Sequence, residues 1–192
     1  MIISTDRQTK GRGRQKNQWT HLQDSLAFSL NRCPNPILTL TPLEMGVLIS
    51  QFFSDFYQKE ILLKWPNDLM NNKHEKVGGI LCETHGSEVI IGVGVNLKPQ
   101  AIENFSHFQA GFLFSTEEQI DSKKLTFELA QYLIQESELR PIPKWTQKCS
   151  HLKQQVQIGE IKGVFQGLGP MGQAILATEK EEVEVYSGSL VY

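Results

Sequence analysis

The fold is decided by one stretch of the chain, VGGILCET-HGS-EVIIGVGVN, which spans residues 77–96. Its two outer parts are rich in Val and Ile and have the length of strands. The central His85-Gly86-Ser87 has the composition of a tight turn, so the stretch predicts a β-hairpin. Glycine replaces larger residues at Gly78-Gly79 and again at Gly92 and Gly94. Either another group packs closely against the backbone there, or the strands carry a bulge.

Outward from this hairpin, apolar residues recur at strand spacing in several further segments. The expected strands span residues 25–30, 61–65, 77–84 and 88–96, with four short ones at 155–160, 162–167, 173–178 and 182–186. The last four are separated by Gly-rich turns, and no helical pattern interrupts them. They predict a small β-barrel.

Two segments have the apolar period of a helix. The first runs from Thr41 to about Tyr57, and we expect Thr41, Pro42 and Glu44 to form its cap as a capping box. Its expected buried side comprises Leu43, Val47, Leu48, Phe52, Phe53 and Phe56. The second begins at Asp121 or Ser122, which can cap it, and Pro141-Ile142-Pro143 stops it. Its expected buried side comprises Leu125, Phe127, Leu129 and Leu133.

Together these elements predict the fold class and the domains. We expect an α/β protein of the α+β kind, with a mixed sheet and helices in a domain over residues 1–148. A small β-barrel domain follows over residues 149–192.

Composition excludes several function classes. The chain has 192 residues, with 19 Lys and Arg against 21 Asp and Glu, and the net charge of −2 argues against a nucleic-acid partner. Three cysteines without a C-x-x-C pair indicate a reducing compartment rather than a disulfide framework. Residues 1–6 do not resemble a signal peptide, and no apolar run has the ~20 residues of a membrane span. We therefore expect a cytoplasmic protein that is not bound to a membrane.

Three polar segments carry groups suited to chemistry. Gly11-Arg12-Gly13-Arg14 places two guanidinium groups, which match phosphate and carboxylate oxygens, on a flexible backbone. Lys64-Trp65-Pro66-Asn67-Asp68 ends a strand with a cation, an amide and a carboxylate, and Lys76 precedes the first glycine pair of the hairpin. Taken singly, the arginine segment is best explained as a solvated loop and the glycine pair as a bulge or tight strand packing, whereas the K-W-P-N-D segment fits a plain turn as well as a ligand site.

The segment Gly167-Leu168-Gly169-Pro170-Met171-Gly172 matches the letters of a dinucleotide-binding loop. That loop requires a strand before it, a helix after it and an acidic residue about 20 positions further on. Residues 173–178 have a strand pattern instead. We interpret the segment as a hairpin turn.

The order of the polar segments is more specific than any one of them. G-R-G-R followed by Trp19, then K-W-P-N-D, then K-x-G-G-I-L, then G-x-G-x-N, resembles the biotin protein ligases from Ile2 to Asn96. The resemblance implies a catalytic domain of mixed α/β type followed by an SH3-like barrel. It also implies an enzyme that forms biotinyl-5'-AMP from biotin and ATP, with Mg²⁺ accompanying the ATP. The biotin then passes to a lysine of a biotin carboxyl carrier protein, a subunit of acetyl-CoA carboxylase. A homodimer is compatible with the resemblance.

The resemblance also implies roles for individual residues. It makes Lys76 and Arg14 catalytic. For biotin it implies Gln8 at the ureido ring, together with Arg12, Gly13, Arg14, Trp19, Lys76, Gly78 and Gly79. For the nucleotide it implies Lys64, Asn67, Asp68 and Asn96, with Asp68 as a candidate Mg²⁺ ligand.

The chain departs from the family pattern in two places. Family members have a Ser-Thr-Asn segment upstream of the arginine loop, and Ser4-Thr5-Asp6 is not its equivalent because it belongs to the strand entering the loop. Gln15-Lys16-Asn17 stands where Arg-Gly-Arg is common. Two alternatives therefore stay open: a truncated, catalytically weak protein that binds biotin or its adenylate, and an enzyme that transfers lipoate or octanoate on the same fold.

Overall fold

The computed structural model describes residues 1–192 except 6, 15–18, 20–21, 23 and 100–109. Its larger sheet has six strands in the order β1-β2-β6-β5-β4-β3, and every neighbouring pair runs antiparallel. The strands are β1 (Ile2–Ser4), β2 (Ser25–Arg32), β3 (Leu62–Lys64), β4 (Asp68–Met70), β5 (Lys76–His85) and β6 (Glu88–Asn96). The predicted hairpin is confirmed as β5 and β6, with Gly86 at φ +61° in the turn.

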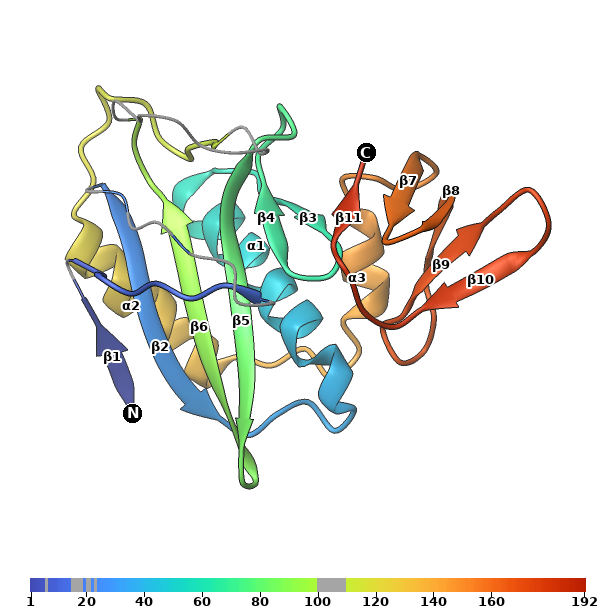
Figure 1. Cartoon of the computed structure of the whole chain (residues 1–192). Helices are drawn as coiled ribbons and strands as arrows, with labels where there is room; N and C mark the ends of the chain where they lie inside the picture. The colour runs from blue at the N-terminus through green and yellow to red at the C-terminus, as the bar shows by residue number, and fades with distance from the viewer. Residues whose placement is uncertain (6, 15–18, 20–21, 23, 100–109) are drawn as a thin grey trace.

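Helices cover one face of this sheet, and the segment after β1 crosses the other face (Figure 1). The short 3₁₀ helix η2 (Leu38–Leu40) leads into α1 (Thr41–Tyr57), and α2 (Ser122–Gln135) packs beside α1 and against β2. The expected apolar faces are buried with two exceptions. Phe56 is 61% exposed and Phe127 is 57% exposed, so both predictions are wrong. Phe56 continues the helical period at the last turn of α1, whereas Phe127 lies two residues from Leu125 and Leu129 and therefore faces away from the buried side of α2.

The predicted capping box at Thr41 is also wrong. Helix α1 follows directly from η2, so its N-cap is Leu40 and no side chain caps it. The Thr41 hydroxyl accepts from the Asn35 backbone N–H instead. Glu44 turns inward, where it is 1% exposed and binds groups from outside the helix. At the second helix, Asp121 caps α2 as expected by accepting from the N–H groups of Lys123 and Lys124.

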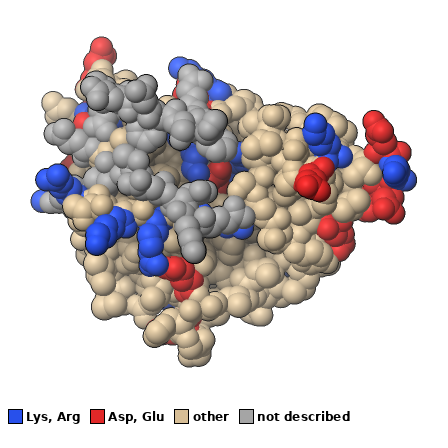
Figure 2. Space-filling model, in the orientation of Figure 1, with Lys and Arg blue, Asp and Glu red and all other residues tan. Residues whose placement is uncertain are grey.

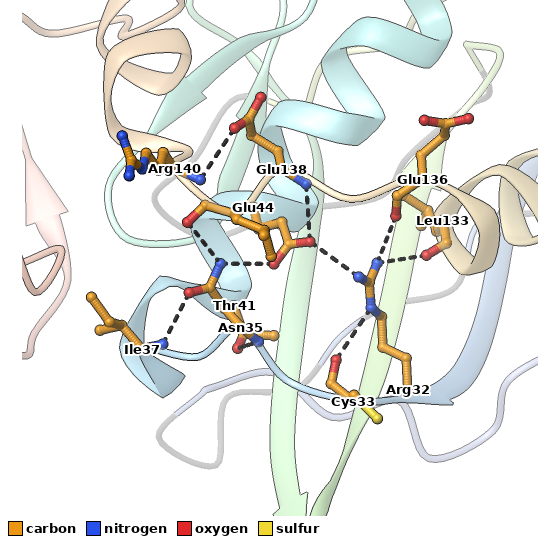
Figure 3. Close-up of polar contacts among 11 residues, drawn as sticks. Arg32, Cys33, Asn35, Ile37, Thr41, Glu44, Leu133, Glu136, Glu138 and Arg140 are labelled. Atoms are coloured by element: carbon orange, nitrogen blue, oxygen red, sulfur yellow. Dashed lines mark hydrogen bonds and ion pairs between the residues drawn. The ribbon is translucent and has the colours of Figure 1, made fainter.

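Glu44 is the centre of a polar cluster between β2, α1 and the segment after α2 (Figure 3). Its carboxylate accepts from Arg32 Nη2 at 3.1 Å, from Asn35 Nδ2 at 3.0 Å and from the Glu138 backbone N–H at 3.2 Å. Arg32 also donates to the carbonyl oxygens of Leu133 and Glu136 at the C-terminal end of α2. One buried ion pair thereby joins the sheet to both long helices.

Pro141 and Pro143, which were expected to end the second helix, lie at the start of a further helix. Helix α2 ends at Gln135, several residues earlier, and the two prolines begin the short helix α3 (Ile142–Gln147), which was not expected. Proline is well tolerated in the first helical turn, where its missing N–H has no partner to lose. Helix α3 buries Trp145 and leads into the second sheet.

The second sheet has the order β10-β9-β8-β7-β11 and is antiparallel. It comprises β7 (Gln155–Ile158), β8 (Ile161–Leu168), β9 (Ala174–Ala177), β10 (Glu182–Val185) and the unexpected β11 (Leu190–Val191). The glycine-rich segment 167–172 is confirmed as the turn between β8 and β9. The fold class is confirmed as α+β, but the larger sheet is antiparallel rather than mixed as expected, because its neighbouring strands are joined by hairpins and antiparallel crossings. The boundary after residue 148 stays a prediction. None of the helices in the described parts of the chain is both long and apolar enough to cross a membrane.

His151 lies between α3 and the second sheet. It is 0% exposed, its ring centroid is 4.3 Å from that of Phe165, and its Nε2 has no hydrogen-bond partner among the described residues. Burial lowers the pKa of His151 to about 3, and the positive charges of Lys64 and His74 act in the same direction. The folded protein therefore holds this imidazole neutral.

Removing the Glu44 carboxylate should destabilise the protein strongly. Glu44→Ala leaves the Arg32 guanidinium buried without its counter-ion, and we expect a loss of about 3–5 kcal/mol in the free energy of unfolding. Glu44→Gln keeps an acceptor oxygen and should lose less. Urea unfolding measures both, with Glu60→Gln as the control because Glu60 forms only an exposed pair with Lys148. Equal losses in the Glu44→Ala and Glu60→Gln variants would contradict the role of the cluster.

The buried His151 predicts acid sensitivity. A folded pKa of about 3, below the ordinary 6.5, means that stability from this group is complete above pH 6.5. It is lost as the pH falls toward 3, at up to roughly 1.4 kcal/mol per pH unit. His151→Leu should flatten the curve of unfolding free energy against pH in this range, whereas His85→Leu, at an exposed site, should not. Parallel curves for wild type and His151→Leu would exclude this explanation of acid sensitivity.

Candidate active site

A cavity of about 360 Å³ lies on the face of the larger sheet opposite the helices. Its wall combines the segment after β1, the central parts of β2, β5 and β6, the turn between β3 and β4, and the residues just before and within β11. Ten of the residues singled out in the sequence line it: Gln8, Arg12, Gly13, Arg14, Trp19, Lys64, Asn67, Asp68, Lys76 and Gly79. Figure 2 shows Lys and Arg side chains gathered around a recess on this side of the molecule. Segments far apart in sequence thus supply one cationic site.

Glycines of the central hairpin form part of the cavity floor, and the Trp19 indole lies against it. A Cβ at Gly94 would be 2.6 Å from Trp19 Cζ2, and a Cβ at Gly79 would be 3.7 Å from Trp19 Cζ3. The group that was predicted to pack closely against these glycines is therefore the indole of Trp19. Gly11 allows this placement, because its own Cβ would stand 2.2 Å from the Trp19 carbonyl oxygen.

Two predicted site residues lie outside the cavity lining. Gly78 points to the helix side of β5, where a Cβ would be 2.5 Å from the Gly94 carbonyl oxygen, so it serves strand pairing. Asn96 is buried at the end of β6, and its Nδ2 donates to the Gly111 carbonyl oxygen at 3.3 Å. This hydrogen bond joins the end of β6 to Gly111, which follows residues 100–109, a segment that the structure does not describe.

Asp68 stands between two ammonium groups. Its Oδ1 is 2.5 Å from Lys76 Nζ, and its Oδ2 is 3.6 Å from Lys64 Nζ. Lys64 is 2% exposed, and burial lowers the pKa of its ammonium group although Asp68 opposes that shift. The three groups together carry a net positive charge beside the cavity, which suits an anionic ligand.

Arg14 joins this cluster from the arginine loop. Its Nη1 donates to Asn67 Oδ1 at 3.4 Å and to the Gly188 carbonyl oxygen at 3.2 Å. Burial lowers the pKa of the guanidinium, and the negative charge of Asp68 counteracts it. Asn67 is itself fixed, because its Nδ2 donates to the Ile80 carbonyl oxygen at 2.5 Å. The turn after β3 is thereby held to β5.

Two further groups of the loop differ in their surroundings. Arg12 is 73% exposed and pairs with Glu83 at 3.1 Å. The Gln8 Oε1 atom is buried and has no hydrogen-bond partner among the described residues. A buried acceptor of this kind is costly unless a ligand N–H satisfies it. Gln15, Lys16 and Asn17, where the loop departs from the family pattern, lie outside the described residues.

Sequence reasoning missed the contribution of the second sheet. Gly188, Ser189 and Leu190 reach the cavity, and Tyr192 lies beside Lys64. The small and apolar residues among them have no motif that marks a site. The pairing of β11 with β7 fixes them within the second sheet, and contacts between the two sheets, such as Trp65 Nε1 with the Gly172 carbonyl oxygen, bring them to the cavity.

Comparison with known proteins shows the family to which the chain belongs. Residues 1–97 match the Biotin/lipoate A/B protein ligase family, and the chain belongs to this family. Biotin–protein ligase 1, chloroplastic, of Arabidopsis thaliana is 36% identical over 108 residues, which are 50% of this chain and 29% of that protein. The bifunctional ligase/repressor BirA of Bacillus subtilis is 35% identical over 109 residues, 52% of this chain and 33% of that protein. The matched part spans about a third of each of these relatives.

A solved structure extends the likeness over the second sheet. The biotin protein ligase from Aquifex aeolicus in complex with biotin and ATP superposes with a TM-score of 0.81 at 28% identity. The match covers 99% of this chain and 87% of that one. The architecture of both sheets is therefore shared with that enzyme.

The stacking of Trp19 on the hairpin can be tested by its fluorescence. Gly94→Ala should displace the indole toward water and shift tryptophan emission to longer wavelength, because Trp65 and Trp145 are buried and stay so. We expect a stability loss of about 1–3 kcal/mol from overpacking. Gly92→Ala is the matched control, since its Cβ would meet nothing closer than 3.7 Å. An unchanged emission maximum in Gly94→Ala would contradict the stacked position.

Proposed function

We propose that this chain is an ATP-dependent biotin protein ligase. It would form biotinyl-5'-AMP from biotin and ATP and then transfer biotin to a lysine of a biotin carboxyl carrier protein, a subunit of acetyl-CoA carboxylase. The observation that carries the proposal is one cavity that contains Arg14, Lys64 and Lys76 as well as the unpartnered Gln8 Oε1. Biotin offers a carboxylate for the cations and ureido N–H groups for the amide oxygen.

In the first step a carboxylate oxygen of biotin attacks the α-phosphorus of ATP. A C–O–P anhydride forms, the bond from the α-phosphorus to the bridging oxygen breaks, and pyrophosphate leaves with the electron pair. Both reactants are anions, so fixed cations lower the barrier by stabilising the charge that develops on the phosphoryl oxygens. We assign this task to Lys76 and Arg14 as catalytic residues, with Lys64 and Asn67 on the nucleotide side.

In the second step the ε-amine of the carrier lysine attacks the carbonyl carbon of the adenylate. An amide bond forms, AMP leaves with the electrons of the C–O bond, and the amine loses a proton to solvent. Water would destroy the anhydride, so the adenylate requires a covered site. We assign the cover to Arg12, Gly13 and Trp19, which line the cavity from the segment that crosses the sheet.

A protein-held Mg²⁺ does not fit the described residues. No group of three His, Cys, Asp or Glu side chains among them could hold a metal ion. Asp68, the candidate ligand, has each carboxylate oxygen directed at an ammonium group. Magnesium would supply polarisation of phosphoryl oxygens when it arrives with ATP.

Two other functions are alternatives to the proposed biotin protein ligase. Transfer of lipoate or octanoate on the same fold would use the same cations, but neither acid offers ureido N–H groups to Gln8. A protein that only binds biotin or its adenylate would need the cavity without turnover. We further propose a cytoplasmic location and no nucleic-acid partner, consistent with the net charge of −2.

Biotin transfer to a carrier domain with MgATP tests the proposal directly. We expect transfer by the wild type, and a decrease in adenylate formation of roughly 10²-fold or more in Lys76→Ala, the scale of losing one donor to transition-state charge. Lys73→Ala, an exposed lysine in the turn before β5, should act like the wild type. The assay is repeated with lipoate and octanoate.

The outcomes separate the candidates. Transfer of lipoate or octanoate in preference to biotin would replace the ligase proposal by the second candidate. Biotin binding without transfer, even at millimolar biotin, would replace it by the binding protein. Normal adenylate formation in Lys76→Ala would remove Lys76 from the mechanism.

A further inference from the structure

Lys64 is a buried cation that Asp68 alone does not neutralise. Asp68 lies closer to Lys76, at 2.5 Å, than to Lys64, at 3.6 Å. The Lys64 side chain is nevertheless only 2% exposed, so water compensates little of its charge. Each electron-rich group in contact with this ammonium group therefore helps to hold it in place.

The ring of Tyr192 supplies such a group from the second sheet. Its centroid lies 5.4 Å from Lys64 Nζ, within the range of a cation–π interaction. The aromatic face attracts the ammonium but carries no formal charge. A second carboxylate at this place would bind the lysine more strongly and would also repel an incoming triphosphate.

Tyr192 is held in place independently of the larger sheet's strands. Its hydroxyl is 3.1 Å from Ser150 Oγ, and the preceding β11 pairs with β7 through Leu190↔Ile158 and Val191↔Gln157. The ring also makes a perpendicular contact with the ring of His74, with centroids 6.1 Å apart. The second sheet thus sets the position of an aromatic ring over a cation of the first.

We propose that Tyr192 is a positioning residue, whose ring holds the Lys64 ammonium beside Asp68 at the end of the cavity that receives the ATP phosphates. The inference rests on the proposed function, because it assigns Lys64 to the nucleotide. It predicts that the ring, and not the hydroxyl, matters for nucleotide binding. Biotin binding, which depends on Gln8 and the arginine loop, is independent of it.

Steady-state kinetics of adenylate formation separate ring from hydroxyl. Tyr192→Leu should raise the KM for MgATP about 2- to 30-fold, the range of a cation–π contact, and leave the KM for biotin unchanged. Tyr192→Phe keeps the ring and should stay near the wild type. Tyr186→Leu removes another exposed tyrosine of the second sheet and is the matched control. Equal effects of Leu and Phe, or an equal rise in both KM values, would overturn the inference.

A measurement without turnover keeps this inference separate from the proposed function. In NMR spectra of the full chain, ring current should shift the Lys64 ε-methylene signals upfield in wild type and Tyr192→Phe, and the shift should vanish in Tyr192→Leu. Thermal unfolding verifies that each variant is folded. A shifted Lys64 signal in a protein that makes no adenylate would refute the ligase proposal and leave the contact standing. An unshifted signal in an active enzyme would refute the contact alone.

Discussion

The close approach of β5 and β6 is the constraint on which the rest of the structure depends. These strands are central in the larger sheet, and a Cβ at Gly78 would stand 2.5 Å from the Gly94 carbonyl oxygen. A side chain there would force the strands apart. On the other face, the bare backbone at Gly94 admits the indole of Trp19. The same hairpin therefore packs against helices on one side and forms the floor of a cavity on the other.

The molecule uses the carboxylates of Glu44 and Asp68 in two different ways. The Glu44 carboxylate accepts hydrogen bonds from three donors, and these bonds join α1 to β2 and to the segment after α2 (Figure 3). Asp68 lies at the cavity with one lysine at 2.5 Å and another at 3.6 Å. An anionic ligand can compete for those lysines, whereas the Glu44 carboxylate that pairs with Arg32 is only 1% exposed and does not face the cavity. Exposure to the cavity distinguishes a structural ion pair from one that can exchange partners.

The second sheet belongs to the site rather than standing beside it. The segment that leads into it, residues 148–150, pairs with Leu63, and the Gly172 carbonyl oxygen in its β8–β9 turn accepts from Trp65 Nε1 at 3.0 Å. These contacts lie just before and within the K-W-P-N-D segment. They bring the Gly188 carbonyl to Arg14 and an aromatic ring to Lys64. Displacing the second sheet would therefore disturb the cations directly.

The sequence by itself determined the elements whose signal is local. The hairpin over 77–96, the long first helix and the Asp121 cap follow from side-chain period and turn chemistry, which act between near neighbours. The ordered motifs also identified the family and most of the cavity residues. Tertiary structure alone decided that Glu44 leaves its helix cap for Arg32, that Gly78 faces away from the cavity, and that β11 completes it. These outcomes depend on which distant groups become neighbours, and that contact information is not present in any local stretch of the chain.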